Sequence, residues 1–316
     1  MFTGTQRFRI LETLGKGGMG VIYRARDAEM QRDVALKTLR RLNPDDVFRL
    51  KEEFRAVAGI VHPNLVELHE LFVEDGQAYF TMEVVEGVGL LDWLWADDQG
   101  GPGLSAGGLA RLEAVLPQLV EGLSAVHAAG RLHRDVKPSN IMVTWDGTAV
   151  LLDFSLALTL GVDQGLDDAA DGTGGTRPYM SPEQAQGLPL GPPSDWYALG
   201  VVLYEALTGR LPFPLPRAEA LVHQQAGRFD RPRALHPETP PHLDALVCAL
   251  LHPDPARRPT GQDLLAALGG ASGSPRVVRA PHPVDAPFVG RAAELDALRA
   301  ALAASAEGLS VAMVSG

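Results

Sequence analysis

The most informative stretch of this chain is H-R-D-V-K-P-S-N, His133 to Asn140, which is followed by D-F-S at Asp153 to Ser155. It combines a carboxylate at Asp135 with a carboxamide at Asn140, and the second carboxylate comes thirteen residues after Asn140. Oxygen atoms of these kinds are the ligands that hard divalent cations prefer. Three such residues recur by chance in many proteins, but eight positions in one pattern indicate a site.

Two motifs upstream extend this pattern. The Gly-rich turn G-K-G-G-M-G runs from Gly15 to Gly20, and V-A-L-K runs from Val34 to Lys37. Without side chains, such a turn lets backbone N–H groups approach phosphate oxygens. Taken alone it is equally explained by a hairpin, but Lys37 follows Gly20 by 17 residues, in the order that phosphate chemistry needs. Together the motifs resemble those of the protein kinase family.

The apolar pattern suits the fold that this resemblance implies, an α+β bilobal protein-kinase fold with a small β-rich N-lobe and a larger helical C-lobe. Short alternating runs fill the first 85 or so residues and are typical of antiparallel strands with one wet face. One helix interrupts them, at about Pro44 to Val57. Longer helical patterns follow Gly87, among them Leu109 to Ala129 and Asp195 to Leu207.

These patterns predict three parts. The kinase domain is expected at residues 8–268, with the N-lobe at 8–85, the C-lobe at 88–268 and a hinge at Glu83 to Gly87. Residues 269–286 are rich in Gly, Pro and Ser and are predicted to be a linker. Residues 287–316 contain F-V-G-R-A-A-E-L and resemble the start of an AAA/STAND-like ATPase domain, truncated where its phosphate loop would begin at Gly316. An amphipathic helix and a strand without such a role are the alternative.

The resemblance implies ATP as the nucleotide, with Mg²⁺ or Mn²⁺. Lys37 would hold the α- and β-phosphates and pair with a glutamate on the next helix, for which Glu53 is preferred over Glu52. Met82 would lie at the back of the adenine pocket. The apolar residues expected above and below the adenine are equally consistent with ordinary core packing. The predicted nucleotide-binding residues are Leu14, Gly15, Gly17, Gly18, Gly20, Ile22, Ala35, Lys37, Met82, Glu83, Val85 and Met142.

The resemblance also assigns roles in the central stretch. Asp135 would accept or orient the proton of the substrate hydroxyl, and Lys137 would contact the γ-phosphate. Asn140 and Asp153 would hold the metal ion. His133 is expected to be structural and to pack beneath Phe154. His127 and His69 show no partner pattern in the sequence, so no role is predicted for them.

Further motifs lie downstream in the order of the family. G-T-R-P-Y-M-S-P-E-Q, Gly175 to Gln184, resembles the substrate-docking end of an activation segment. Within it Glu183 is expected to form a buried bridge with Arg258. Asp195 is expected to cap the backbone of the catalytic loop from a core helix.

The activation segment departs from the common pattern. Ser155 replaces the usual glycine, which is expected to slow switching of the segment. Arg134 would pair with a phosphate on Thr173, with Thr176 kept for substrate positioning. Alternatively, aspartates substitute for the phosphate, and these are Asp163, Asp167, Asp168 and Asp171.

Composition limits the partners. The formal net charge is −11, and residues 269–316 carry four Arg against two Asp and two Glu, so the acidity belongs to residues 1–268. An acidic surface argues against nucleic acid as a partner. The sequence has no apolar run of 18 or more residues and no apolar N-terminal leader, so neither a membrane partner nor a secretory signal is expected. We therefore expect a cytoplasmic location.

The sequence thus predicts an ATP-dependent Ser/Thr protein kinase that autophosphorylates, acts on serine or threonine of protein substrates and belongs to bacterial signalling. The alternative is a pseudokinase or scaffold that regulates an attached NTPase domain.

Overall fold

The computed structural model describes residues 2–17, 20–39, 44–74, 77–97, 104–153, 177–213, 217–269 and 278–279. The chain divides into a compact unit at Met1–Arg279 and a second at Ala280–Gly316, and all of the described residues belong to the first. Gly18, residues 270–277 of the predicted linker and the predicted ATPase segment at 287–316 lie outside the described residues.

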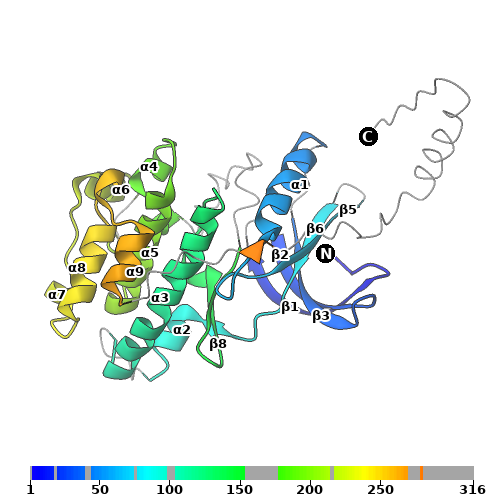
Figure 1. Ribbon diagram of the computed structural model, residues 1–316, viewed down its shortest axis with the longest axis horizontal. Coiled ribbons are helices and arrows are strands. Elements are labelled where there is room, and N and C mark those ends of the chain that lie inside the picture. The colour runs from blue at the N-terminus through cyan, green and yellow to red at the C-terminus, as the bar shows by residue number, and fades with distance from the viewer. Residues whose placement is uncertain are drawn as a thin grey trace, which may run out of the picture. The chain divides into compact units, whose positions relative to one another are not determined.

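An antiparallel sheet forms the first half of the fold (Figure 1). Its order is β1-β2-β3-β6-β5, as alternating apolar runs predict. The strands are β1 (Phe8–Gly17), β2 (Gly20–Asp27), β3 (Arg32–Thr38), β5 (Leu68–Glu74) and β6 (Gln77–Met82). Two further strands pair beside it, β4 (Ile60–Val61) and β10 (Val278–Arg279).

The two-residue period of β3 determines which side chains share a face of this sheet. Val34 and Leu36 belong to one buried cluster with Tyr23 and Tyr79. Ala35 belongs to the main core, on the opposite face. Because successive side chains of a strand alternate, Lys37 projects on the same face as Ala35.

The helix α1 (Pro44–Ala58) packs on the same sheet and matches the predicted helix within one residue at its end. Leu50, Phe54 and Val57 are buried at helical spacing, and the Phe54 ring lies 5.9 Å from that of Phe80 on β6. Glu53 therefore lies at the edge of the buried stripe of α1.

Helices dominate the second half of the fold (Figure 1). The α-helices are α2 (Leu90–Leu94), α3 (Ala106–Ala128), α4 (Pro182–Ala185), α5 (Pro192–Thr208), α6 (Arg217–Ala226), α7 (Pro232–Leu235), α8 (Pro241–Leu250) and α9 (Gly261–Ala267). Short 3₁₀ turns are η1 (Pro138–Asn140), η4 (Arg177–Tyr179) and η5 (Pro255–Arg257). The two long patterns predicted from the sequence correspond to α3 and α5.

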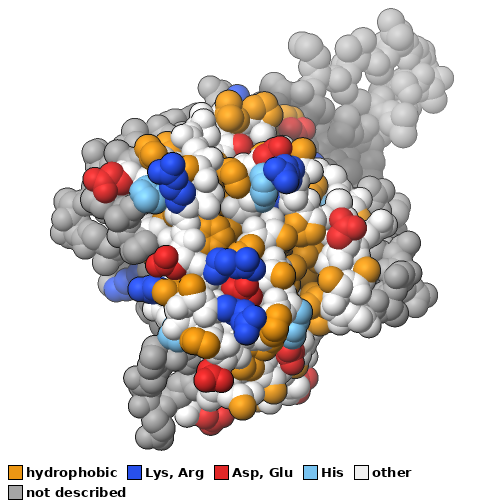
Figure 2. Space-filling model, turned by 90° about the vertical axis from the view of Figure 1, so that its left-hand side faces the viewer, with side chains coloured by type: hydrophobic (Ala, Val, Ile, Leu, Met, Phe, Trp, Pro, Cys, Tyr) orange, Lys and Arg blue, Asp and Glu red, His pale blue; other side chains and the backbone are white. Residues whose placement is uncertain are grey.

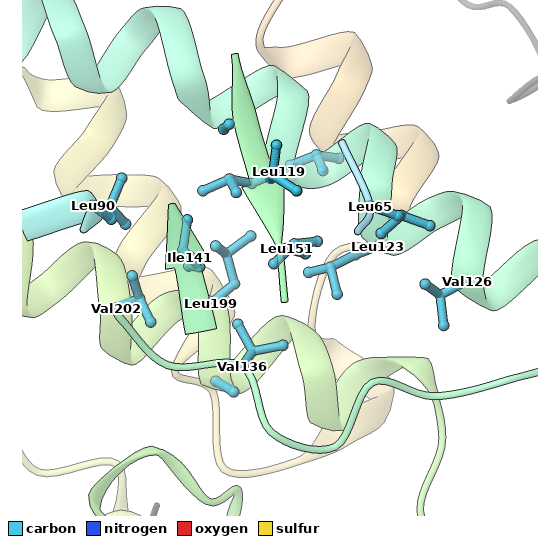
Figure 3. Packing of buried hydrophobic residues seen from close by; sticks show 14 of the residues in the cluster. Leu65, Leu90, Leu119, Leu123, Val126, Val136, Ile141, Leu151, Leu199 and Val202 are labelled. Carbon is cyan, nitrogen blue, oxygen red and sulfur yellow. The ribbon is translucent and has the colours of Figure 1, made fainter. Parts of the chain in front are cut away.

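A small sheet carries the segment that follows the catalytic stretch. It has the order β7-β8-β9, with β7 (Gly87–Gly89), β8 (Ile141–Thr144) and β9 (Ala149–Leu151). Its apolar side chains pack against α3 and α5 (Figure 3). Val136 of the H-R-D-V motif is 1% exposed and points into this packing, which fixes the backbone beside Asp135.

Side chains of both charges are mixed on the face of the molecule that Figure 2 shows. Figure 2 shows basic, acidic and apolar side chains interspersed over the described part of the side on which α7 and α8 lie. This face therefore offers no continuous acidic patch among the described residues. Within the described part of the chain, no helix is both long and apolar enough to cross a bilayer.

Gly20 is required by the close contact between β2 and β3, because its φ is +151° and an added Cβ would lie 1.8 Å from the Thr38 carbonyl oxygen. We expect Gly20→Ala to lower the free energy of unfolding by about 1–3 kcal/mol, through overpacking and backbone strain. Gly15→Ala is the matched control, because a Cβ at Gly15 would meet nothing within 4 Å. Urea unfolding measures both, and equal stability of the two variants would contradict the expectation.

Candidate active site

Lys37 and Asp153 form an ion pair between the two halves of the fold. The Lys37 Nζ lies 2.5 Å from the Asp153 Oδ1, and the two side chains are 9% and 19% exposed. Lys37 reaches this position from the inner face of β3, while Asp153 follows β9 in the chain. The strand pattern of the N-terminal sheet thus directs an ammonium group to the predicted metal ligand.

The structure does not show the predicted pairing of Lys37 with Glu53, because it pairs Lys37 with Asp153 instead. The Glu53 carboxylate instead binds Arg131, whose Nη1 lies 3.3 and 3.1 Å from its two oxygens. Glu53 lies on α1 and Arg131 follows α3, so the orientation of α1 determines which cation Glu53 meets. A spacing rule within the sequence carries no information on that orientation.

Asp135, Lys137 and Asn140 converge in the catalytic stretch. The Asp135 Oδ2 accepts a hydrogen bond of 2.8 Å from the Asn140 Nδ2 and lies 2.9 Å from the Lys137 Nζ. The Asn140 Nδ2 also donates to the Asp135 carbonyl at 2.9 Å. Because the amide nitrogen makes both bonds, the Asn140 oxygen is the atom that can face a cation.

Asp195 on α5 caps this stretch, as predicted. Its carboxylate accepts hydrogen bonds from the backbone amides of His133 and Arg134, at 2.9 and 2.7 Å. Burial alone would raise the pKa of Asp195, but the hydrogen bond from His127 and the neighbouring His133 hold it below its ordinary value. The carboxylate thus stays charged and fixes the loop that carries Asp135.

His127 is a residue that the sequence interpretation missed. Its Nε2 lies 2.8 Å from the Asp195 Oδ2, and its ring meets Trp196 edge to face at 5.0 Å. Asp195 is 68 residues away in the chain, so no local pattern could reveal the contact. The other unassigned histidine, His69, contacts Arg32 on the sheet rather than the site.

His133 is buried, which fits the structural role expected for it. Its Nε2 lies 2.9 Å from the Leu152 carbonyl oxygen, and its Nδ1 accepts from the Asp135 amide at 3.4 Å. The ring therefore joins the catalytic stretch to the segment before Asp153. The predicted contact partner, Phe154, lies outside the described residues.

Two site residues have left-handed backbone conformations, Arg134 with φ of 64° and Asp153 with φ of 52°. Such conformations are strained for residues other than glycine and persist where the surroundings enforce them. The Arg134 Nε is buried without a hydrogen-bond partner among the described residues. The proposed phosphate partners Thr173 and Thr176 lie outside those residues, as do Ser155 and the four aspartates.

The predicted adenine pocket is built from strands that meet at the hinge. Ala35 pairs with Met82 across β3 and β6, and both are buried. The Glu83 N–H donates to the Glu67 carbonyl at 3.0 Å, so Glu83 can offer adenine only its carbonyl. The remaining predicted contacts lie around this edge: Ile22 and Val85 are half-buried, Leu14 is 48% exposed and Met142 lies on β8.

The glycines of the Gly-rich turn differ in what they contribute. At Gly15 and Gly17 an added Cβ would meet nothing within 4 Å, so the backbone there borders open space. Gly20 instead faces the Thr38 carbonyl, and its missing side chain serves the contact of β2 with β3. Nothing in the sequence separated these two roles.

The predicted bridge between Glu183 and Arg258 is present and almost fully buried. Two guanidinium nitrogens of Arg258 lie 2.6 and 2.9 Å from the Glu183 carboxylate oxygens, and the side chains are 0% and 8% exposed. Ser194 donates to Glu183 at 2.8 Å, and the Arg258 guanidinium lies 4.8 Å from the Tyr197 ring centre. This network joins α4, α5 and the turn η5.

The residues present fit a nucleotide with a divalent cation. The Asp135 Oδ1 is buried and accepts no hydrogen bond within the described part of the chain. Asp153 and the Asn140 amide add the oxygen donors that Mg²⁺ prefers. Lys37 supplies the positive charge next to them.

The comparisons with known proteins agree with this geometry. Residues 8–268 match the family model described as "Protein kinase domain". The serine/threonine-protein kinase pkn2 of Myxococcus xanthus is 36% identical over 277 residues, which cover 84% of this chain and 32% of that protein. PknE of Mycobacterium tuberculosis is 35% identical over 274 residues, covering 85% and 47%. PrkC of Bacillus subtilis is 34% identical over 279 residues, covering 86% and 41%.

The matched part of the chain thus spans 32% to 47% of the length of these relatives. Among solved structures, the PknI kinase domain of Mycobacterium tuberculosis superposes with a TM-score of 0.66 at 23% identity, covering 85% of this chain and 98% of that one. That likeness shows the fold. The family match and the relatives show more: this chain belongs to the protein kinase family, and its kinase domain is of the eukaryotic-like serine/threonine type found in bacteria.

Proposed function

We propose that this chain transfers the γ-phosphate of ATP to serine or threonine hydroxyls of protein substrates, with Mg²⁺ or Mn²⁺ as the metal. The observation that carries the proposal is the convergence of Asp135, Lys137 and Asn140 within hydrogen-bond distance. The ion pair of Lys37 with Asp153 adds a phosphate-binding cation beside a metal ligand. Family membership of residues 8–268 supports the same reaction class.

The chain's own residues account for proton handling and positioning. The free oxygen of Asp135 can accept the hydrogen bond of an incoming hydroxyl, while the other oxygen is held by Asn140 and Lys137. Lys137 adds a positive charge at the point where the transferred group would carry negative charge. The bound metal would supply charge neutralisation between the phosphates, and Asn140 and Asp153 are the residues that would hold it.

The test is transfer of label from γ-labelled ATP to a generic basic protein, with the modified amino acids then identified. We expect phosphoserine and phosphothreonine, together with autophosphorylation, and no transfer by Asp135→Ala. Nucleotide binding without transfer by the wild-type chain would instead support the pseudokinase alternative. Phosphotyrosine as the product would contradict the proposed substrate class.

The segment after the kinase domain carries a separate proposal. We infer from F-V-G-R-A-A-E-L, Phe288 to Leu295, that residues 287–316 begin an AAA/STAND-like ATPase domain. A phosphate-binding G-x-x-x-x-G-K-[ST] starting at Gly316 in the full-length sequence would support this, and a different continuation would refute it. Cytoplasmic location is likewise a proposal, which cell fractionation would test.

A further inference from the structure

Arg131 and Glu53 form the contact that links α1 to the catalytic stretch. The Arg131 guanidinium binds both oxygens of the Glu53 carboxylate, and Arg131 lies two residues before His133. Lys37, meanwhile, is held by Asp153. Asp153 is thus paired with Lys37, and Glu53 is paired with Arg131.

We infer that Arg131 is a positioning residue that competes with Lys37 for Glu53 and thereby sets how often the nucleotide site is ready. The inference rests on the proposed function, because readiness there means a Lys37 ammonium oriented toward the phosphates of ATP. When Glu53 binds Arg131, Lys37 neutralises Asp153, which the proposed function needs as a metal ligand. When Glu53 binds Lys37, Asp153 is released for that role.

The exposure of the four side chains makes both arrangements accessible. Arg131 is 39% exposed and Glu53 26%, whereas Lys37 is 9% and Asp153 19% exposed. Releasing Arg131 returns a guanidinium to water, where it is well solvated. Moving Glu53 toward Lys37 keeps the buried ammonium paired, so neither arrangement leaves an unpaired buried cation. The observed arrangement has two ion pairs and the alternative has one, in which Arg131 is solvated and Asp153 is released for the metal ion. The exposed pair of Arg131 with Glu53 therefore shifts the balance toward the observed arrangement.

The movement needed is a shift of α1 on the sheet. Leu50, Phe54 and Val57 hold α1 by apolar contacts, which are non-directional and tolerate small displacements better than hydrogen bonds do. The contact of Arg131 with Glu53 is directional, because its hydrogen bonds require the Arg131 Nη1 to lie close to both carboxylate oxygens. Arg131 therefore adds a directional contact to the apolar packing and favours the observed orientation of α1.

The test compares Arg131→Gln and Arg131→Met with the wild-type chain. An exposed ion pair shifts a two-state equilibrium by about two- to fivefold, so both variants should raise the affinity for a non-hydrolysable ATP analogue with Mg²⁺, and the kcat/KM for ATP, by that factor. Amide hydrogen exchange of α1 without nucleotide should change in the same variants. The conservative Arg131→Lys should stay close to the wild type.

Arg55→Gln is the matched control, because Arg55 is exposed on α1 and forms no ion pair within the described residues. It should leave affinity, kcat/KM and exchange unchanged. In a Glu53→Gln background, Arg131→Gln should have no further effect on affinity, since the competed group is gone. The ratio of variant to wild-type affinity should also fall as salt rises, because salt screens the exposed pair.

Several results would overturn the inference. They are an unchanged or lowered affinity in both variants, the same effect in the Glu53→Gln background, or an equal effect of Arg55→Gln. Thermal unfolding establishes that each variant is folded, and two chemically different replacements guard against a folding defect in one. If the wild-type chain transfers phosphate and the variants behave like it, the competition fails while the proposed function stands. If no chain transfers phosphate, the proposed function itself fails.

Discussion

Asp135→Asn is expected to lower kcat for phosphate transfer by about 10² to 10⁴-fold, the range typical of a lost general base. The replacement keeps the size of the side chain and an oxygen that can accept hydrogen bonds from Asn140 and Lys137, although the contact with Lys137 is no longer an ion pair. It removes the anionic oxygen that lies buried without a partner among the described residues. An amide cannot take the hydroxyl proton, so the loss should appear in kcat.

The measurement is steady-state transfer at saturating ATP and protein substrate, with nucleotide affinity measured separately. Affinity for ATP should change little, since Asp135 faces the hydroxyl and not the phosphates. Glu121→Gln is the matched control, because Glu121 is exposed on α3 and undergoes the same acid-to-amide change. A kcat within threefold of the wild type would show that Asp135 does not act on the hydroxyl proton.

Arg258→Ala should lower the free energy of unfolding by about 3–5 kcal/mol, as is usual when one partner of a buried ion pair is removed. The change leaves the Glu183 carboxylate, 8% exposed, with Ser194 as its remaining side-chain partner. It also removes hydrogen bonds from the guanidinium to the carbonyls of Pro193 and Pro253, at 2.9 and 3.1 Å. Because these bonds join separate segments, the loss affects the second half of the fold as a unit.

Urea unfolding followed by circular dichroism tests this loss. Arg257→Ala is the matched control, since Arg257 is the adjacent residue in η5 and is exposed. It should change stability by less than about 0.5 kcal/mol, as surface substitutions usually do. Equal stability of the two variants would show that the bridge contributes little.

The pH dependence of the same bridge has a defined sign. Burial alone would raise the pKa of Glu183, but the hydrogen bonds from Arg258 and Ser194 hold it below its ordinary value of 4.5. A carboxylate with a lowered pKa in the folded state stabilises the fold above its unfolded pKa, and this contribution disappears as the pH falls through the folded value. The stability difference between wild type and Arg258→Ala should therefore stay nearly constant from neutral pH down to about pH 4.5 and narrow as the pH falls further, which urea unfolding at a series of pH values measures.

Local sequence patterns predicted the strands and helices well, because the period of apolar residues depends only on residues that are neighbours in the sequence. The period of two in β3 indicated a strand, and the structure has one at Arg32–Thr38. The helix expected from Pro44 is α1, and the long patterns after Gly87 are α3 and α5. The buried bridge of Glu183 and the cap by Asp195 were also predicted, because the motifs that contain them resemble those of the kinase family.

The partners of long side chains were less accessible to this kind of reasoning. His127 had no assigned role, although its contact with Asp195 is among the shorter ones at the site. The sequence also did not show that Gly20 is needed for the contact of β2 with β3, because this need depends on how close the Thr38 carbonyl lies to Gly20. Each contact depends on distances between segments that no single stretch of sequence contains.

The sequence by itself determined the identity and order of the chemical groups: the carboxylates of Asp135 and Asp153, the amide of Asn140 and the ammonium of Lys37. It also determined the strand and helix periods that carry these groups, because a period depends only on neighbouring residues. Only the tertiary structure decided that Glu53 meets Arg131, 78 residues away, and that Lys37 meets Asp153. An ion pair forms with whichever charge packing brings within about 4 Å, and the packing of α1 depends on the whole fold.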